Sequence, residues 1–584
     1  MKNDCISSVD GEAGPMTGQG TFARSVRFLG GALAAVALAS LVQCTGTADR
    51  YDVLIRNGRI IDGTGDPGFY ADVAIRDDSI AAVGSLDGAE ADQVIDATGL
   101  TVTPGFIDMH THSDYTLLVD GNAESAIRQG ITTDILGENS SAGPLLGAAR
   151  IERERSLEPT PLDPDWTTLG EYFSRLEQSG ISVNVASYVG SGQVRMAVMG
   201  SENREPSEAE LSEMESLVDQ AMQEGALGLS SALSYVPNTF MDVDEMVRLA
   251  KVAARHGGLY ATHLRRQNLE IESGIREAIE IGRRADLPVH IFHFKVKHPD
   301  MWGKFHQYTS LVDEARAEGV KVTADLYPYI AGTTNLAASM PPRFLDGGTE
   351  KMLELIRNPE VRAEIRRDIA QGLPEWENEV AEAGGWGRMV VSAVQKPENE
   401  KYEGKSIAEV AEMMGEDPVD AMCDLLLSEG GRVPMIQHAA AEPDLEQAIG
   451  LPWMAIGSDG VAMNPDDFPW MGKPHPRSYG TYPRVLGVYV REKGLVPISD
   501  AIRKMTGLPA QILGFQDRGL LKPGMKADVV LLDADSVVDR ATFENPQVYP
   551  LGIEYVFVNG VMVLDRGNHT GAHPGRVLRR TDGR

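Results

Sequence analysis

Cysteine is scarce in this chain of 584 residues, which contains only three, at positions 5, 44 and 423. Cys5 and Cys44 lie near the N-terminus, so Cys423 stands alone in the rest of the chain. This excludes a disulfide framework within that region, and also a zinc site built from several thiolates. Cys423 lies in “DPVDAMCDLLL”, an amphipathic helical pattern, and we expect it to be a small buried core residue.

Basic residues are also in the minority, with 54 Lys and Arg against 85 Asp and Glu and a formal net charge of −31. Nucleic acids and anionic membrane surfaces bind to basic patches, so we expect neither as a partner. The charge indicates a solvated acidic exterior.

Long hydrophobic runs are rare, and the one that stands out is “FLGGALAAVALASLV” at residues 28–42, after Arg24 and Arg27. Its length suits the core of a secretory signal and is short for a membrane span. We interpret residues 1–45 as an export signal and expect a periplasmic or secreted protein, with a single membrane anchor as the alternative. Because residues 1–15 are acidic, Met16 is an alternative start.

The export signal ends in a stretch that resembles a lipidation site at Cys44. “LVQC” at 41–44 resembles a lipoprotein box, but Gln43 stands where a small residue is expected. A lipid anchor on Cys44 therefore stays open as an alternative to simple secretion.

The two ends of the remaining chain have the alternating apolar pattern of β-strands. Residues 50–103 include Asn57-Gly58 and residues 506–584 include Asn559-Gly560, and such pairs between apolar runs predict hairpin turns. We predict one composite β-sandwich formed by both segments.

Residues 104–505 alternate strand-like and helix-like stretches, the pattern of a parallel α/β barrel. The helix expected over 207–225 opens with a capping box, Ser207 and Glu210. We predict a (β/α)8 TIM-like barrel with strands at 102–112, 131–138, 182–190, 226–231, 259–265, 289–295, 321–329 and 453–460.

More than one helix separates the last two of these strands. Residues of about 340–435 contain several helical patterns, and we predict an inserted helical subdomain near the barrel mouth. Long insertions of this kind often form lids or specificity elements.

Histidines follow the predicted strands at the end where barrel active sites assemble. His110 and His112 are two residues apart in the first strand and so point to one face. His263 and His293 end the fifth and sixth strands, and Asp459 ends the eighth. Four strand ends that carry such residues predict a metal site.

The motifs “PGFIDMHTH”, “GITT”, “YATHLR”, “HIFHFK” and “IGSDG”, in this order, resemble the amidohydrolase superfamily. The stretches “HPRSYGTYPRVLG” and “KMTGLPAQILGFQDRGLLKPGMKADVVLLD” are similar to those of its N-acyl-D-amino-acid deacylase, or D-aminoacylase, group. The likeness covers about residues 50–578. It implies a zinc-dependent barrel enzyme that hydrolyses N-acyl-D-amino acids as small-molecule substrates.

Two departures from the wider pattern concern the metal ligands. Many amidohydrolases bridge two metals with a carboxylated lysine on the fourth strand, but “ALGLSSALSYVP” has no lysine. Members of the deacylase group commonly have a cysteine at the end of the second strand, where this chain reads “GENSS”. Glu138 is the strong ligand in that turn, and its two oxygens could bridge two ions. A site with one metal, at which Glu138 only caps the loop, is the alternative.

The resemblance implies that His110, His112 and Asp459 hold one zinc ion and that His263 and His293 hold the other. Asp459 would also act as the catalytic general base, and then as general acid toward the leaving amine.

An N-acyl amino acid also carries a carboxylate, which needs cationic or hydroxyl partners. Lys295, Arg265, Arg477, Arg484, Tyr235 and Tyr327 all lie close to strand ends. By resemblance we favour Lys295, Arg477 and Tyr327 as the substrate-binding residues.

Other functions stay open at this level, because barrels support many reactions. A cyclic amidase or a dipeptidase would use the same residues, and a metal-binding module without catalysis is a further alternative. Stereochemical preference, metal number and oligomeric state are not encoded in these patterns.

Overall fold

The computed structural model describes residues 50–158, 160–374 and 376–580. The predictions for the export signal at 1–45, for the start at Met16 and for Cys44 lie outside these residues. Among the described helices, none combines the length and the apolar character needed to cross a membrane.

Eight parallel strands form a closed barrel, which confirms the predicted fold class. The third strand is interrupted at Tyr188, which separates β8 from β9. A parallel bridge between Thr111 and Gly460 joins the first strand to the last. The strands in barrel order are β6 (Phe106–Asp108), β7 (Ile131–Leu136), β8 (Asn184–Ser187) with β9 (Val189–Gly190), β10 (Gly228–Ala232), β11 (Leu259–His263), β12 (Val289–Ile291), β13 (Val322–Leu326) and β17 (Met454–Ile456).

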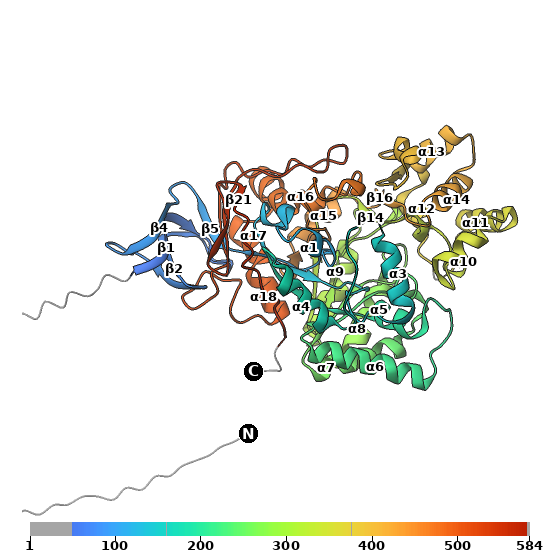
Figure 1. Ribbon diagram of the computed structural model, residues 1–584, viewed down its shortest axis with the longest axis horizontal. Coiled ribbons are helices and arrows are strands. Elements are labelled where there is room, and N and C mark those ends of the chain that lie inside the picture. Colours follow the sequence, from blue (N-terminus) through green and yellow to red (C-terminus); the bar gives the residue numbers. More distant parts are fainter. Residues whose placement is uncertain (1–49, 159, 375, 581–584) are drawn as a thin grey trace, which may run out of the picture. The chain divides into compact units, whose positions relative to one another are not determined.

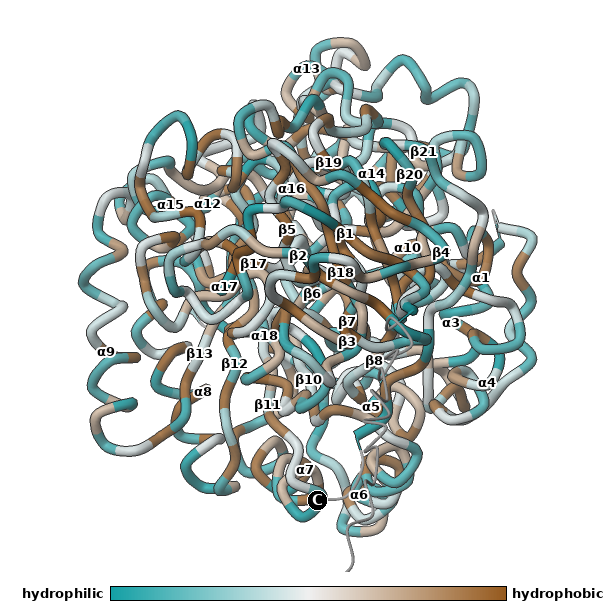
Figure 2. The backbone as a smooth tube through the Cα atoms, turned by 90° about the vertical axis from the view of Figure 1, so that its left-hand side faces the viewer, coloured by the Kyte–Doolittle hydropathy of each residue, from teal (hydrophilic) through white to brown (hydrophobic). Residues whose placement is uncertain are grey.

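Amphipathic helices surround the strands and bury their apolar faces against them. The predicted capping box is present, since Ser207 and Glu210 each bond the backbone of the other at the start of α6. Figure 2 shows hydrophobic segments gathered along inner strands such as β12 and β18, and hydrophilic segments mostly on the surrounding helices and loops. The helices include α3 (Gly147–Leu157), α4 (Leu169–Ser179), α5 (Ser191–Met199), α6 (Glu208–Gln223), α7 (Val243–Arg255), α8 (Ile271–Ala285), α9 (His306–Ala317), α15 (Glu442–Ile449), α16 (Arg477–Arg484), α17 (Ile498–Met505) and α18 (Gly507–Leu513).

The N- and C-terminal segments share one nine-stranded sheet, in which blue and red strands lie side by side (Figure 1). The central contact is β5, which pairs with β1 in parallel and with β18 antiparallel. Side chains from both segments, such as Val73 and Phe557, share a buried core. The strands are β1 (Arg50–Ile60), β2 (Phe69–Arg76), β3 (Ser79–Gly84), β4 (Glu90–Asp96), β5 (Thr101–Pro104), β18 (Val529–Leu532), β19 (Ile553–Val558), β20 (Val561–Asp565) and β21 (Asn568–His569).

One of the two predicted hairpin turns is wrong. Asn57-Gly58 lies inside the single strand β1, where the register with β2 shifts between Ile55 and Gly58. Asn57 has a φ of 62°, and a Cβ on Gly58 would lie 2.4 Å from Val102 Cγ2. The pair therefore makes a bulge that admits β5, not a turn. Asn559-Gly560 does form the turn between β19 and β20, with positive φ at both residues.

The region between β13 and β17 contains the expected helices and also a small antiparallel sheet, which the sequence pattern did not predict. The sheet's strands span only three or four residues each, too short for an alternating pattern to be visible. Figure 1 shows this region on the side of the barrel away from the terminal sheet. Its elements are β14 (Gly332–Asn335), α10 (Gly348–Leu355), α11 (Pro359–Gln371), α12 (Glu379–Ala383), β15 (Met389–Val391), α13 (Ile407–Met414), α14 (Pro418–Ser428) and β16 (Pro434–Gln437).

Cys423 lies on α14 in the core of this region, and burial raises the pKa of its thiol to about 12. In a variant with Cys5 and Cys44 replaced by serine, we expect no reaction with a disulfide reagent at about pH 8, because the reactive species is the thiolate. The measurement is thiol release with and without denaturant. Full reaction without denaturant would show that this core opens in the native protein.

Candidate metal centre

Six side chains predicted from the sequence meet at the carboxyl ends of the barrel strands. Their ligand atoms fall into two groups that share Glu138, and within each group they lie within 4.8 Å of one another. The groups are His110, His112, Glu138 and Asp459, and Glu138, His263 and His293. Each of these residues lies at or close to the end of a barrel strand. The barrel brings all the strand ends together, and this fixes the arrangement of the six side chains.

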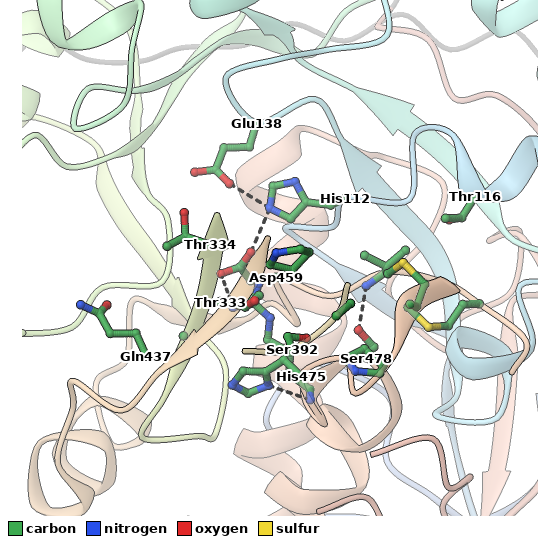
Figure 3. A pocket seen from close by; sticks show the side chains of 18 of the residues that line it. His112, Thr116, Glu138, Thr333, Thr334, Ser392, Gln437, Asp459, His475 and Ser478 are labelled. Atoms are coloured by element: carbon green, nitrogen blue, oxygen red, sulfur yellow. Dashed lines mark hydrogen bonds and ion pairs between the residues drawn. The ribbon is translucent and has the colours of Figure 1, made fainter. Parts of the chain in front are cut away.

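The first group is the tighter one. Nε2 of His110 lies 2.6 Å from Oε2 of Glu138, and Nε2 of His112 lies 3.2 Å from the same oxygen. Nε2 of His112 is also 3.0 Å from Oδ1 of Asp459 (Figure 3). Two imidazoles and two carboxylates thus face one point.

The second group uses the other oxygen of Glu138. Oε1 lies 3.6 Å from Nδ1 of His263 and 3.9 Å from Nε2 of His293. These distances exceed those of normal hydrogen bonds. Glu138 therefore turns one oxygen to each pair of histidines, which is the geometry of a bridging carboxylate.

The backbone at two of these residues is strained. His293 has a φ of 35° and Asp459 a φ of 50°, both in the left-handed region that non-glycine residues rarely adopt. The His293 N–H donates to Oδ1 of Asp325 at 2.7 Å, and the Asp459 N–H donates to the His110 carbonyl at 2.8 Å. Strain held by such bonds is typical of functional sites.

Charges in the cluster divide the histidines into two kinds. Burial alone would lower the pKa of His110 and His112, but Glu138 and Asp459 outweigh it; the pKa of His112 rises to about 9 and that of His110 well above its usual range. Burial lowers the pKa of His263 despite Glu138, and burial together with Lys295 lowers that of His293 far more. His263 and His293 are thus neutral near pH 7 and can offer a lone pair.

The donor set fits a divalent metal of the zinc type. Four imidazoles and two carboxylates are ligands that zinc accepts. Among the described residues, Nε2 of His263 and Nδ1 of His293 are buried without a hydrogen-bond partner. Glu138 would carry a negative charge, because His110 and the other histidines overcome the effect of burial and hold its pKa well below the usual range. A cation between these groups would balance that charge.

A cavity of about 570 Å³ opens over this cluster and contains the three predicted substrate-binding residues. The Arg477 guanidinium and the Lys295 ammonium lie 4.8 and 5.2 Å from the centre of the Tyr327 ring. Nη1 of Arg477 also donates to Oδ2 of Asp459 at 2.6 Å. Burial and the neighbouring Lys297 lower the pKa of Lys295 to about 7. The cavity therefore presents a guanidinium, an amine that is protonated in only part of the molecules near pH 7, and a phenol beside the metal-binding groups.

Two other arginines considered from the sequence do not line this cavity. Arg265 forms an ion pair with Glu277, and Arg484 binds Asp539 and the carbonyl of Pro328. Tyr235 does line the cavity.

Sequence reasoning missed two buried carboxylates behind the histidines. Oδ1 of Asp108 accepts from the N–H groups of His110 and Ser458. Asp325 accepts from Nε2 of His290 at 2.9 Å, besides the His293 N–H. A charged residue inside an apolar strand was the available signal, since burial of a charge requires partners.

A closed α/β barrel with histidines and carboxylates converging at its strand ends defines the class of metal-dependent barrel hydrolases. Within that class, residues 93–564 match the model described as “Amidohydrolase family”. The chain belongs to that family and, within it, to the N-acyl-D-amino-acid deacylase group.

Its relatives are similar over nearly their whole length. The D-aminoacylase of Alcaligenes xylosoxydans xylosoxydans is 34% identical, covering 91% of this chain and 98% of the relative. The N-acyl-D-glutamate deacylase of the same organism is 35% identical, with coverages of 91% and 97%. The crystal structure of N-acyl-D-glutamate deacylase from Bordetella bronchiseptica, with zinc and a phosphonate inhibitor, superimposes with a TM-score of 0.76 at 31% identity, covering 91% of this chain and 100% of that one.

Replacement of Glu138 tests the bridging geometry. We expect Glu138→Ala to retain about one fewer zinc ion per chain than the unchanged protein, because each group of ligands loses an oxygen. Glu138→Cys should retain more zinc than Glu138→Ala, since a thiolate is also a zinc ligand. Metal content after dialysis is measured by mass spectrometry. The control is Glu213→Gln, an exposed residue on α6. Unchanged zinc in Glu138→Ala would show that Glu138 is no ligand.

Proposed function

We propose that this chain hydrolyses the amide bond of N-acyl-D-amino acids to a carboxylate and a free D-amino acid. The observation that carries the proposal is one cavity in which the cluster around Glu138 lies beside Lys295, Arg477 and Tyr327. Such a substrate has an amide to be cleaved and a carboxylate to be held, and the cavity offers groups for both. The names of the relatives, D-aminoacylase and N-acyl-D-glutamate deacylase, support the D configuration.

The metal in this proposal is zinc, as in the related crystal structure. His110, His112 and Asp459 would hold one ion, His263 and His293 a second, and Glu138 would bind both. When bound, zinc polarises a carbonyl oxygen as a Lewis acid and lowers the pKa of water to about 7.

Asp459 is the proposed general base and acid. Burial by itself would raise its pKa, but the Arg477 guanidinium and His110 hold it well below the usual range. The carboxylate is therefore ionised at neutral pH and can accept a proton from water. It then returns this proton to the nitrogen of the leaving amine, which departs as a neutral amine. The acyl product forms as a carboxylic acid and loses the second proton of the water to solvent, which gives the carboxylate. Arg477, through its bond to Oδ2, fixes the direction of the carboxylate.

The substrate carboxylate has a place close to that amine. Lys295 and Arg477 both lie against the Tyr327 ring, and the hydroxyl of Tyr327 is buried without a partner among the described residues. A guanidinium and an ammonium around one carboxylate give charge-assisted hydrogen bonds. The held carboxylate would orient the scissile amide over the metal ligands.

We also propose that the protein is exported to the periplasm or the medium, on the basis of the apolar run at 28–42. Lipid attachment at Cys44 is the variant of this proposal that the “LVQC” sequence supports.

Paired substrates test the reaction and its stereochemistry. We expect the zinc-loaded protein to release free amine from N-acetyl-D-amino acids at least about 100-fold faster than from the L forms, since one inverted centre misplaces the amide or the carboxylate. Chelator should abolish the reaction and added zinc restore it. Equal rates on both forms would remove the stereochemical part of the proposal, and no rate on either would refute the activity.

Replacement of Asp459 tests proton transfer. We expect Asp459→Asn to lower kcat by about 10²- to 10⁴-fold, the usual contribution of general acid–base catalysis. At least one zinc ion should remain, held by Glu138, His263 and His293. The matched control is Asp466→Asn, an exposed carboxylate in the same loop. Near-normal turnover by Asp459→Asn would exclude the proposed role.

A further inference from the structure

The cavity has one wall that is almost entirely apolar. Two segments form it, the loop after β17 and the short helix α1 (Thr116–Val119). Trp470 and Met471 are half-buried and Met463 and Phe468 are buried; all four line the cavity and pack in one apolar cluster. In Figure 3, Thr116 and Ser478 lie on one side of His112 and Asp459, and Thr334 and Gln437 lie on the other.

This wall adjoins the half of the substrate that becomes the free amino acid. Asp459 must reach the leaving nitrogen, so the amino-acid half lies on its side of the cluster. Val461 and Met463 lie two and four positions after Asp459 in the chain and line the same cavity. The apolar surface is thus the one that a side chain on the amino-acid half would meet.

Cations for a second carboxylate are few. Of the described residues that line the cavity, four are lysines or arginines: Lys295, Lys297, Arg432 and Arg477. Lys295 and Arg477 flank Tyr327 and serve the carboxylate that every N-acyl amino acid carries. Arg432 forms an ion pair of 3.1 Å with Glu158 and also binds the carbonyl of Arg155.

Lys297 is already surrounded by carboxylates. Its Nζ lies 3.3 Å from both Glu379 and Glu382 and 3.8 Å from Glu377, and all four side chains are buried. Three carboxylates around one ammonium neutralise its charge, so Lys297 does not attract a further anion. A second substrate carboxylate would therefore be buried beside these glutamates or against the apolar wall, and both are unfavourable.

We propose that the wall of Val461, Met463, Phe468, Trp470 and Met471 binds an uncharged apolar side chain, and that the enzyme discriminates against N-acyl-D-glutamate and N-acyl-D-aspartate. This inference rests on the proposed deacylase function and narrows its substrate class to monocarboxylates. The names of two relatives, D-aminoacylase and N-acyl-D-glutamate deacylase, imply different preferences for the substrate side chain. Both are about equally similar to this chain, at 34% and 35% identity, so overall similarity does not decide between the two preferences and the argument rests on the residues of the cavity.

The test compares kcat/KM of the zinc-loaded protein for the N-acetyl forms of D-leucine, D-methionine, D-glutamine, D-glutamate and D-aspartate. We expect the two acidic substrates to be at least about 100-fold poorer than D-leucine, because their second charge has no partner. D-Glutamine has the shape of D-glutamate without its charge, so it should be clearly better than D-glutamate. A rate on D-glutamate equal to or above that on D-leucine overturns the inference.

Two variants locate the side-chain site. Trp470→Ala should lower kcat/KM for N-acetyl-D-leucine about 10-fold or more, because apolar contact with the leucine side chain is lost. The same variant should affect N-acetyl-D-alanine less. Met471→Lys should raise the ratio of D-glutamate to D-leucine by about 10-fold, since it adds a cation to the wall. Met413→Ala, exposed on α13, is the control. If neither variant changes the preference, the assignment of this wall is wrong.

Failure of the proposed function gives a different result. In that case no N-acyl-D-amino acid is hydrolysed, whatever its side chain. Calorimetric binding of N-acetyl-D-leucine and N-acetyl-D-glutamate to the zinc-loaded protein then still decides the inference. Tighter binding of D-leucine supports the apolar site, and equal or tighter binding of D-glutamate contradicts it.

Discussion

The arrangement of the site depends on the contacts of one buried carboxylate with four histidines. Glu138 lies among four histidines, with one oxygen toward His110 and His112 and the other toward His263 and His293. A buried charge is tolerated only with partners, so these four side chains and Glu138 constrain one another. The sharing of one carboxylate between two pairs of imidazoles is what makes two neighbouring cation positions possible.

Backbone hydrogen bonds of the barrel fix the positions of the residues in this cluster. Closure of the first strand on the last places the Asp459 N–H on the His110 carbonyl and the His112 N–H on the Gly460 carbonyl. Behind the cluster, Asp108 and Asp325 hold the backbone of His110 and His293 by hydrogen bonds. Such supporting contacts fix ligand orientation before any metal or substrate binds. The loops beyond the strand ends are then free to determine which substrate fits.

Much of the fold could be predicted because its signals are local. Each barrel strand is a short apolar run bounded by turn residues, and the capping box of Ser207 and Glu210 marks a helix start by itself. Asn57-Gly58 shows the limit of such signals: the same dipeptide makes a turn at Asn559-Gly560 and a bulge in β1. The deciding factor at Gly58 is the close approach of Val102, which is distant in sequence. The strands β14, β15 and β16 were missed because each spans only three or four residues, so no alternating pattern is visible, and their pairing depends on distant segments.

The sequence by itself determined the family, the barrel with its composite sheet, and the residue types at the strand ends, since these follow from periodicity and from motifs of a few neighbouring residues. It offered Lys295, Arg265, Arg477 and Arg484 as candidate cations, of which the resemblance favoured Lys295 and Arg477. The tertiary structure supplied the physical distinction, by placing Lys295 and Arg477 around Tyr327 and pairing Arg265 and Arg484 elsewhere. It alone also showed that three glutamates surround Lys297. The physical reason is that charge compensation depends on distance in space, which residues far apart in the chain acquire only when it folds.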